Sequence, residues 1–175
     1  MGLIRLNDQS LTAVSALPAG VGGKVLQVVS ATKTDKFTHS STTFTTVTGL
    51  TVDITPVSTS SKILVMINVQ GSQDVNSNDG FVAIYRDATP IGVGDADGSR
   101  TRNSFLLQSS AAGWAESGSM TTLDSPSTIS QITYSVKVAA RDAGTIFINR
   151  SESNSNATSG AGSMASSITV MEIAG

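Results

Sequence analysis

The chain has 175 residues, a length that fits one domain with a sizeable hydrophobic core. It contains 11 Lys and Arg, 13 Asp and Glu and no cysteine, which excludes disulfides, thiolate metal sites and cysteine nucleophiles. The charges are scattered and form no basic stripe, so nucleic acid is not an expected partner. Ser and Thr are frequent while Lys, Glu and Leu are scarce, a composition that favours strands and turns over helices.

Residues 1–23 predict a unit separate from the rest of the chain. Two short apolar patterns are followed by Pro18 and the sequence AGVGG, which is typical of a flexible joint. No apolar run is continuous enough for a signal peptide or long enough for membrane insertion, so we expect a soluble chain. We expect residues 1–23 to be an arm that becomes ordered on a partner, with residues 24–175 forming a β domain. The expected docking residues of the arm are Ile4, Leu6, Leu11, Val14 and Leu17.

The first half of the β domain predicts three strands, in KVLQVVSATK, FTTVTGLTVDITP and SSKILVMINVQ. In the first half of the third segment both faces are apolar, because Leu64 and Met66 point one way and their alternating neighbours point the other way, namely Ile63, Val65, Ile67 and Val69. Such a strand is central in a sheet and is covered on both sides. We expect the second cover to be another subunit, with an interface formed by Ile63, Val65 and Ile67.

The second half predicts further strands separated by turns. GFVAIYRDATPIGVG is typical of a hairpin that turns at RDATP, and QITYSVKVAA alternates apolar and polar residues before RDAG turns the chain into GTIFINR. LLQSSAAGW fits either one short helix or a loop. SSITVMEIAG ends the chain as a strand that must pair inside a sheet. Seven to nine short strands without a convincing helix predict an all-β fold, an antiparallel β-sandwich of the jelly-roll kind.

The stretch DVNSNDG resembles part of a calcium-binding EF-hand loop. Asp74, Asn76 and Asn78 match its first three ligand positions. Asp79 stands where such a loop needs glycine, and Tyr85 stands where it needs a bidentate glutamate. A turn between strands is therefore favoured. The stretch GDADG, with two more carboxylates, is likewise interpreted as a turn, and no metal ligand is assigned.

The remaining candidate sites argue against catalysis. His39 is the only histidine, so a zinc site cannot be built within one subunit, although three copies could meet around an ion at a trimer axis. The three glutamates and the single Trp114 offer no carboxylate pair beside a stacking surface, and no GxSxG motif is present. We therefore expect no enzyme activity and no cofactor.

Several polar loops are candidate contact regions. The stretch SESNSNATSGAGS is most simply a long solvated loop, with a variable contact loop as the alternative. Trp114 is either an exposed contact residue or a cap on the sandwich. The residues expected in exposed contact loops are Asn76, Asn78, Asp79, Asp95, Asp97, Arg100, Trp114, Asn154 and Asn156.

The order of these blocks resembles a known group of proteins. GKVLQVVSATKTD, FTTVTGLTVDITPVSTSSKILVMINV, FVAIYRDATPIGVGDADGSR, GTIFINRS and SSITVMEIAG together are similar to small β-rich virion proteins of tailed bacteriophages, especially phages of marine bacteria and cyanobacteria. Such proteins are often described as tail-fibre or structural proteins, and the resemblance covers nearly all of residues 23–175. It implies a homotrimeric knob of jelly-roll subunits with a tumour-necrosis-factor-like shape, and it carries no catalytic residues.

This resemblance sets three expectations for function. The first is a virion surface fibre or knob, made in the host cytoplasm, that contributes to host attachment through a surface receptor. The second is a capsid decoration protein whose arm grips other virion proteins and whose sandwich stabilises the head. The third, least favoured, is a glycan-processing enzyme, for which the sequence barely offers a carboxylate pair.

Overall fold

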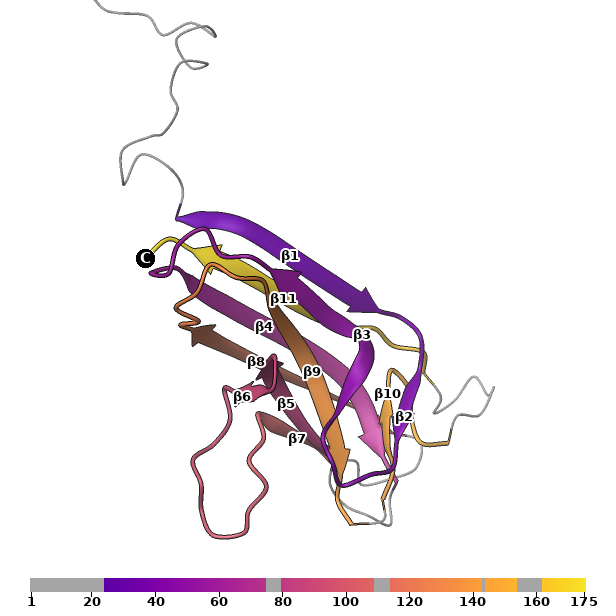
Figure 1. Cartoon of the computed structure of the whole chain (residues 1–175). Helices are drawn as coiled ribbons and strands as arrows, with labels where there is room; N and C mark the ends of the chain where they lie inside the picture. The colour runs from indigo at the N-terminus through magenta and orange to yellow at the C-terminus, as the bar shows by residue number, and fades with distance from the viewer. Residues whose placement is uncertain (1–23, 75–79, 109–113, 143, 154–161) are drawn as a thin grey trace, which may run out of the picture.

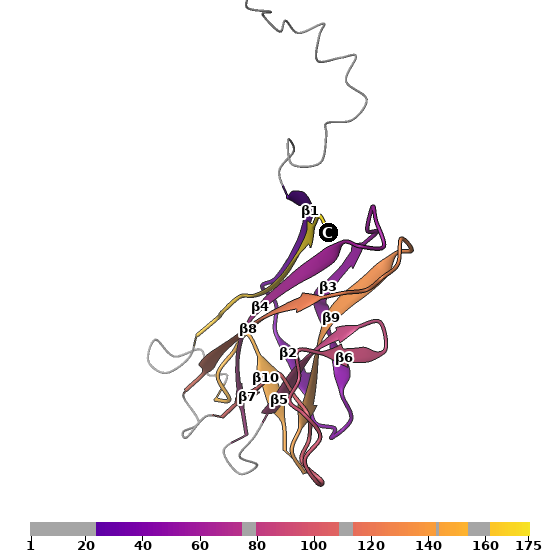
Figure 2. The same cartoon turned by 90° about the vertical axis from the view of Figure 1, so that its left-hand side faces the viewer.

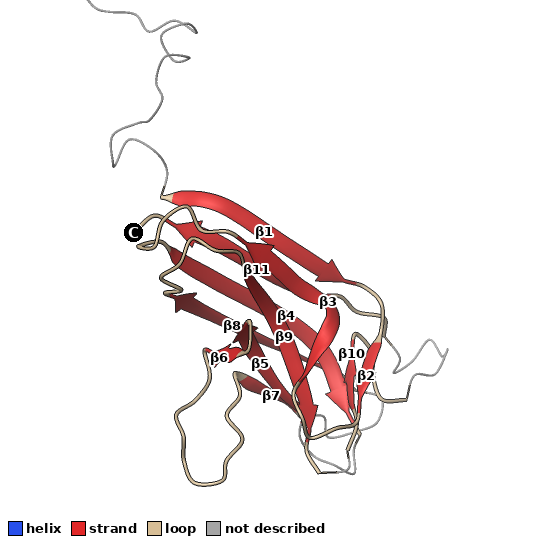
Figure 3. Ribbon diagram, viewed as in Figure 1, coloured by secondary structure: helices blue, strands red, loops and turns tan. Residues whose placement is uncertain are grey.

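The structure is a computed structural model that describes residues 24–74, 80–108, 114–142, 144–153 and 162–175. Within these ranges the chain forms strands, turns and loops and no helix (Figure 3). The strands build two antiparallel sheets that pack face to face, which confirms the expected all-β sandwich. The docking residues expected in the arm lie outside the described residues.

The larger sheet is organised around one long strand (Figure 1). β4 pairs with β11 along its first half and with β10 at its end, while β8 pairs with its opposite edge. β1 lies beyond β11, and β2 lies beyond β10. The six strands are β1 (Val25–Lys33), β2 (Phe37–His39), β4 (Lys62–Gln73), β8 (Glu116–Asp124), β10 (Ile146–Ile148) and β11 (Ser166–Ile173).

The smaller sheet has the order β3-β9-β5-β6, with β7 also paired to β5. β6 and β7 pair with opposite ends of β5, and the chain between them leaves the sheet as an exposed loop (Figure 1). The view along the side in Figure 2 shows the two sheets as separate layers. The strands are β3 (Thr45–Ile54), β5 (Gly80–Arg86), β6 (Thr89–Ile91), β7 (Phe105–Leu107) and β9 (Ile132–Ala140).

The hydrophobic core fills the space between the two sheets. Aliphatic side chains at alternate positions of β3, β4, β9 and β11 meet there, because alternate residues of a strand point to one face. In β9, for example, Tyr134 is fully buried while its neighbour Thr133 is half-buried. Where apolar and polar residues alternate, as in β9, the sequence therefore indicates which face of the strand is internal.

The expected subunit interface is wrong for the three residues assigned to it. Ile63 and Val65 have no exposed surface and Ile67 is 3% exposed, within the chain's own core. Their cover is the second sheet of the same chain, so they cannot contact another subunit. The opposite face of β4 carries Leu64 and Met66, which are half-buried.

Most of the expected strands are present, and one of the two expected hairpins is formed. The hairpin of β5 and β6 turns at Asp87, whose φ of 50° suits a tight hairpin turn, and Arg86 pairs with Thr89. β11 lies inside the larger sheet between β1 and β4, which confirms that the last strand is paired on both sides. The C-terminus consequently lies beside the start of β1, where Ala174 N donates to Lys24 O at 2.7 Å (Figure 1).

The return of the chain after β9 differs from the expected hairpin. GTIFINR contributes β10, which pairs with β4 and β2 in the larger sheet and not with β9. The chain therefore crosses from one sheet to the other, and Thr145 O accepts a 2.8 Å hydrogen bond from Asp74 N on arrival. In LLQSSAAGW the described part begins as the end of β7, and residues 109–113 lie outside the described residues.

Candidate interaction surface

The outward face of the larger sheet carries a row of apolar side chains across four strands. Val28 of β1 pairs with Met171 of β11, Met171 pairs with Leu64 of β4, and Leu64 pairs with Leu123 of β8. Neighbouring strands lie about 4.8 Å apart, so this row is roughly 15 Å wide. Further apolar residues flank it on the same strands. We call the whole set the apolar face: Leu26, Val28, Leu64, Met66, Leu123, Met171 and Ile173.

The apolar face is open in the single chain. Leu26, Val28 and Leu123 are 44%, 53% and 58% exposed, and the other four residues are half-buried. An antiparallel sheet with one solvated face normally alternates apolar residues inward with polar residues outward. Here successive residues are apolar in three strands, so the outward side has the character of a second, uncovered core surface. Contiguous apolar surface of this kind makes the apolar face a candidate interaction surface.

Charge is nearly absent from this side of the sheet. The outward-facing residues of β1, β4, β8 and β11 include one charged side chain, Lys62, whose ammonium donates to the Ser125 hydroxyl at 2.8 Å. Beyond the apolar row the outward positions turn polar but stay neutral, as where Asn68 pairs with Ser167 and Ser119. Two copies of an uncharged surface meet without like-charge repulsion, so this face is suited to self-association.

β8 was not expected from the sequence, so Leu123 was missed as a member of the apolar face. ESGSMTTLD has no apolar alternation, and its strand forms because β4 offers a free edge along residues 63–71. The signal that the sequence did carry was the doubly apolar character of neighbouring residues in three segments. The pattern of neighbouring apolar residues on opposite faces, assigned above to β4, also occurs at Val28 and Val29 and at Val170 and Met171.

Apart from the apolar face, a group of polar side chains lies between the sheets. Asp124 accepts two hydrogen bonds of 2.9 Å from Arg86 Nη1 and one of 2.7 Å from the Tyr134 hydroxyl. Burial, together with the bond to Asp124, raises the pKa of Tyr134 well above its usual range. These hydrogen bonds tie β8 to β5 and β9.

The sequence-predicted loop residues are dispersed. Asp95, Asp97 and Arg100 are exposed on the loop between β6 and β7, where Arg100 forms an ion pair with Asp97. Trp114 is 67% exposed, so it does not cap the sandwich. The other residues expected in contact loops lie outside the described residues: Asn76, Asn78, Asp79, Asn154 and Asn156.

The described residues also limit other kinds of site. His39 Nε2 lies 3.0 Å from Thr43 O, and the described part of the chain gathers no three His, Asp or Glu side chains that could hold a metal ion. Over the same ranges, no helix has the length and apolar character needed to cross a membrane. No protein-family model matches the chain, and no curated protein sequence matches it.

Proposed function

We propose that the chain is a non-enzymatic structural subunit that assembles with copies of itself through the apolar face. The observation that carries this proposal is the unbroken apolar row over β1, β11, β4 and β8. Burying such a row removes apolar surface from water, which stabilises the assembly by about 25 cal/mol for each Å² of apolar surface buried. Because the face is almost uncharged, another copy of the same surface is the partner that it fits best.

We further propose that the assembly is a homotrimeric knob on a bacteriophage virion. The virion setting and the number of subunits rest on the resemblance of the sequence blocks to small β-rich phage structural proteins. A jelly-roll subunit is supported by the strand orders β1-β11-β4-β8 and β3-β9-β5-β7, in which the chain repeatedly crosses between sheets. Host attachment is the proposed role of the knob, exercised through its exposed loops.

Self-association is tested by light scattering, which gives the molar mass of the purified chain in solution over a range of concentrations. A species of three times the chain mass is expected. Replacing Leu123 with Lys places a charge on the apolar face and should yield a folded monomer, because Leu123 is 58% exposed in the single chain. Its melting temperature should fall only by the stabilisation that association gives the wild type, and should not depend on protein concentration.

Ile129→Lys is the matched control. Ile129 is 60% exposed and lies in the loop between β8 and β9, outside the apolar face. Its substitution should leave the oligomer intact. A wild-type chain that stays monomeric at tens of micromolar, or a control that dissociates as fully as Leu123→Lys, would refute assembly through this face.

The location on the particle is decided by copy number. Quantitative mass spectrometry of purified virions gives the ratio of this chain to the major capsid protein. A small ratio is expected for a knob on the tail or at a unique vertex. A ratio near one would instead identify a capsid decoration protein, and the apolar face would then join subunits around the head.

A further inference from the structure

A polar pocket lies on the smaller sheet, on the other layer of the sandwich from the apolar face. Its volume is about 460 Å³, within the range of pockets that bind small molecules. The walls come from four separate segments: Thr42 before β3, Phe81 on β5, Ser99 and Thr101 on the loop between β6 and β7, and Arg141 with Asp142 after β9.

The inner wall of the pocket is held by the sheet itself. Phe81 pairs with Ala139 and Leu106 and points outward, because its neighbour Val82 is in the core. The segment that carries Thr42 is anchored by the 2.9 Å hydrogen bond from Ala140 N to Ser41 O. The Phe81 ring is thus held by a paired strand, and the Thr42 hydroxyl follows directly after a hydrogen-bonded residue.

The outer wall is a loop that is braced within itself. The Arg100 guanidinium forms an ion pair with the Asp97 carboxylate, and the backbone Arg100 N donates to Asp97 O at 3.2 Å. Arg102 Nε donates to Gly94 O at 2.6 Å, across the base of the loop. These contacts hold Ser99 and Thr101 at the rim without using their hydroxyl groups, since neither hydroxyl takes part in them.

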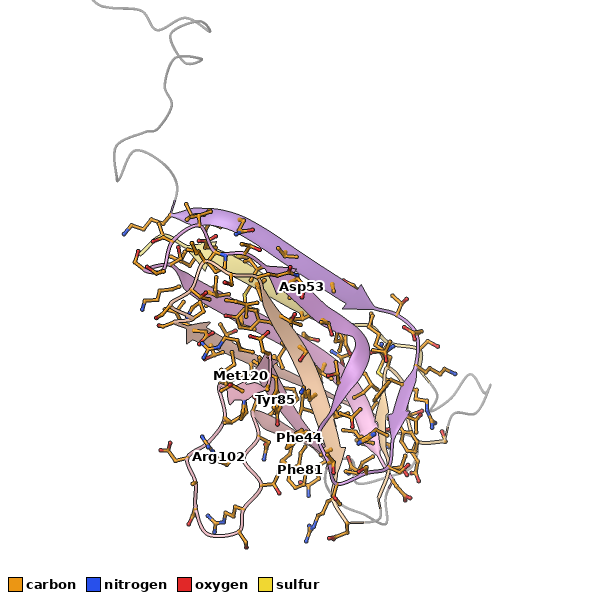
Figure 4. All side chains as sticks on the ribbon, viewed as in Figure 1. Phe44, Asp53, Phe81, Tyr85, Arg102 and Met120 are labelled. Carbon is orange, nitrogen blue, oxygen red and sulfur yellow. The ribbon has the colours of Figure 1, made fainter. Side chains whose placement is uncertain are left out.

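Aromatic surface continues from the pocket along the sheet. Tyr85 lies four residues beyond Phe81, on the same face of β5 because alternate residues of a strand share a face, and its ring centroid is 5.9 Å from that of Phe44. Lys137 lies 4.2 Å from the centre of the Tyr85 ring. Figure 4 shows the labelled Phe44, Phe81 and Tyr85 side chains at this end of the sheet. Three of the chain's eight aromatic residues are therefore gathered here, which the sequence alone did not indicate.

The chemistry of the walls selects a class of ligand. Arg141 and Asp142 place one positive and one negative group at the rim, 3.4 Å apart, so neither a strongly anionic nor a strongly cationic ligand is favoured. The three hydroxyls can each donate and accept hydrogen bonds, and a purely apolar ligand would leave them without partners. A pyranose ring satisfies both requirements, because it carries hydroxyls on its edge and a C–H face that packs on an aromatic ring.

We propose that this pocket binds a neutral saccharide, with Phe81 as the stacking surface and with Arg141, Asp142 and Thr101 as hydrogen-bonding groups. The strip formed by Tyr85 and Phe44 would receive the next sugar of an oligosaccharide. The site uses a different sheet from self-association, so the saccharide proposal and the assembly proposal succeed or fail independently.

Titrations followed by NMR amide shifts test the proposal on the full chain. The probes are the methyl glycosides of glucose, galactose, mannose and N-acetylglucosamine, each with its disaccharide, and inorganic phosphate as an anionic comparison. At least one sugar should cause saturable shifts at Phe81, Thr101 and Arg141. Phe81→Leu, which keeps apolar volume but removes the ring, and Arg141→Ala should each weaken that binding at least tenfold.

Asp53→Asn is the control. Asp53 lies on β3 of the same sheet, bonded to the Thr133 hydroxyl and apart from the pocket (Figure 4). This substitution should leave sugar binding unchanged. The proposal is overturned if no probe sugar shifts the pocket residues, if Phe81→Leu binds as tightly as the wild type, or if phosphate binds there as well as the best sugar.

Discussion

Glu172 is a buried carboxylate whose charge is held by hydrogen bonds. Its side chain has no exposed surface and accepts bonds from Gln27 Nε2 at 2.6 Å and from Val57 N at 2.8 Å. Burial acts to raise the pKa of Glu172, but the hydrogen bonds outweigh it and the pKa lies below the ordinary value of 4.5. The carboxylate thereby joins β1, β11 and the loop between β3 and β4 at one end of the sandwich.

Replacing Glu172 with Gln should lower the unfolding free energy by about 1–3 kcal/mol at pH 7, because one of the two donors loses its acceptor and the other keeps only a neutral one. A lowered pKa in the folded state means that this stabilisation is present above about pH 4.5 and is lost as the pH falls through the folded-state pKa. Urea denaturation at pH 7 and pH 3 measures it. The gap in unfolding free energy between wild type and Glu172→Gln should shrink at pH 3, and a gap of constant size would contradict a stabilising charged carboxylate. Asp95→Asn, at an exposed carboxylate, should show no such gap.

Tyr134 and Asp124 form a hydrogen bond across the core between the two sheets. Tyr134→Phe removes the hydroxyl and should cost about 1 kcal/mol of unfolding free energy, while Asp124→Asn should cost more because Arg86 also loses its charged partner. The double substitution should cost less than the sum of the two, since both remove the same bond. A double-mutant cycle by chemical denaturation gives the coupling energy, and additive effects would show that the bond contributes nothing.

At the level of elements, the strands that the sequence predicted are those with apolar alternation. β4 and β9 could be read from their residues, because each buries one face against the opposite sheet. β8 and β2 could not, because their stability comes from pairing with β4 and β10 and not from their own pattern. The sequence also did not predict the sheet to which β10 belongs. A turn signal such as RDAG does not specify whether the chain pairs again with the preceding strand or crosses to the other sheet.

The same limit applies to the candidate surfaces. Leu64 and Met66 were visible as a second apolar face, but assigning Ile63 to an interface required knowing which face the second sheet covers. The pocket beside Phe81 is formed by four segments that are distant in the sequence, so no local motif predicts it. Sites assembled by topology rather than by spacing are found only once strand order is known.

β8 packs closely against β7, and this contact depends on a glycine. A Cβ at Gly118 would overlap the ring of Phe105, which lies against the core. Gly118→Ala should therefore lower the unfolding free energy by about 1–3 kcal/mol, the usual cost of overpacking. Thermal denaturation checks this, with Gly94→Ala as the control because a Cβ there meets nothing within 4 Å. Equal melting temperatures for the two variants would show that Phe105 moves aside freely.

For the whole molecule, every residue of the buried core that the structure describes lies after residue 23. The buried cluster runs from Val47 to Val170, and the earliest residue packed against it is Val29. Deleting Met1 to Gly23 should therefore leave the melting temperature within about 2 °C of the full chain, a shift that corresponds to less than about 1 kcal/mol. Because the apolar face begins at Leu26, the shortened chain should also keep its oligomeric mass.

If the proposed virion role holds, the consequence of that deletion should appear only in assembly onto the particle. If residues 1–23 dock onto other virion proteins, the shortened chain will be absent from purified virions in a complementation assay while the full chain is incorporated. The two measurements together separate the possible roles of the segment. Loss of incorporation with an intact oligomer supports a docking arm. Unfolding or dissociation of the shortened chain would instead make the segment part of the sandwich or of its interface, and the docking role would be rejected.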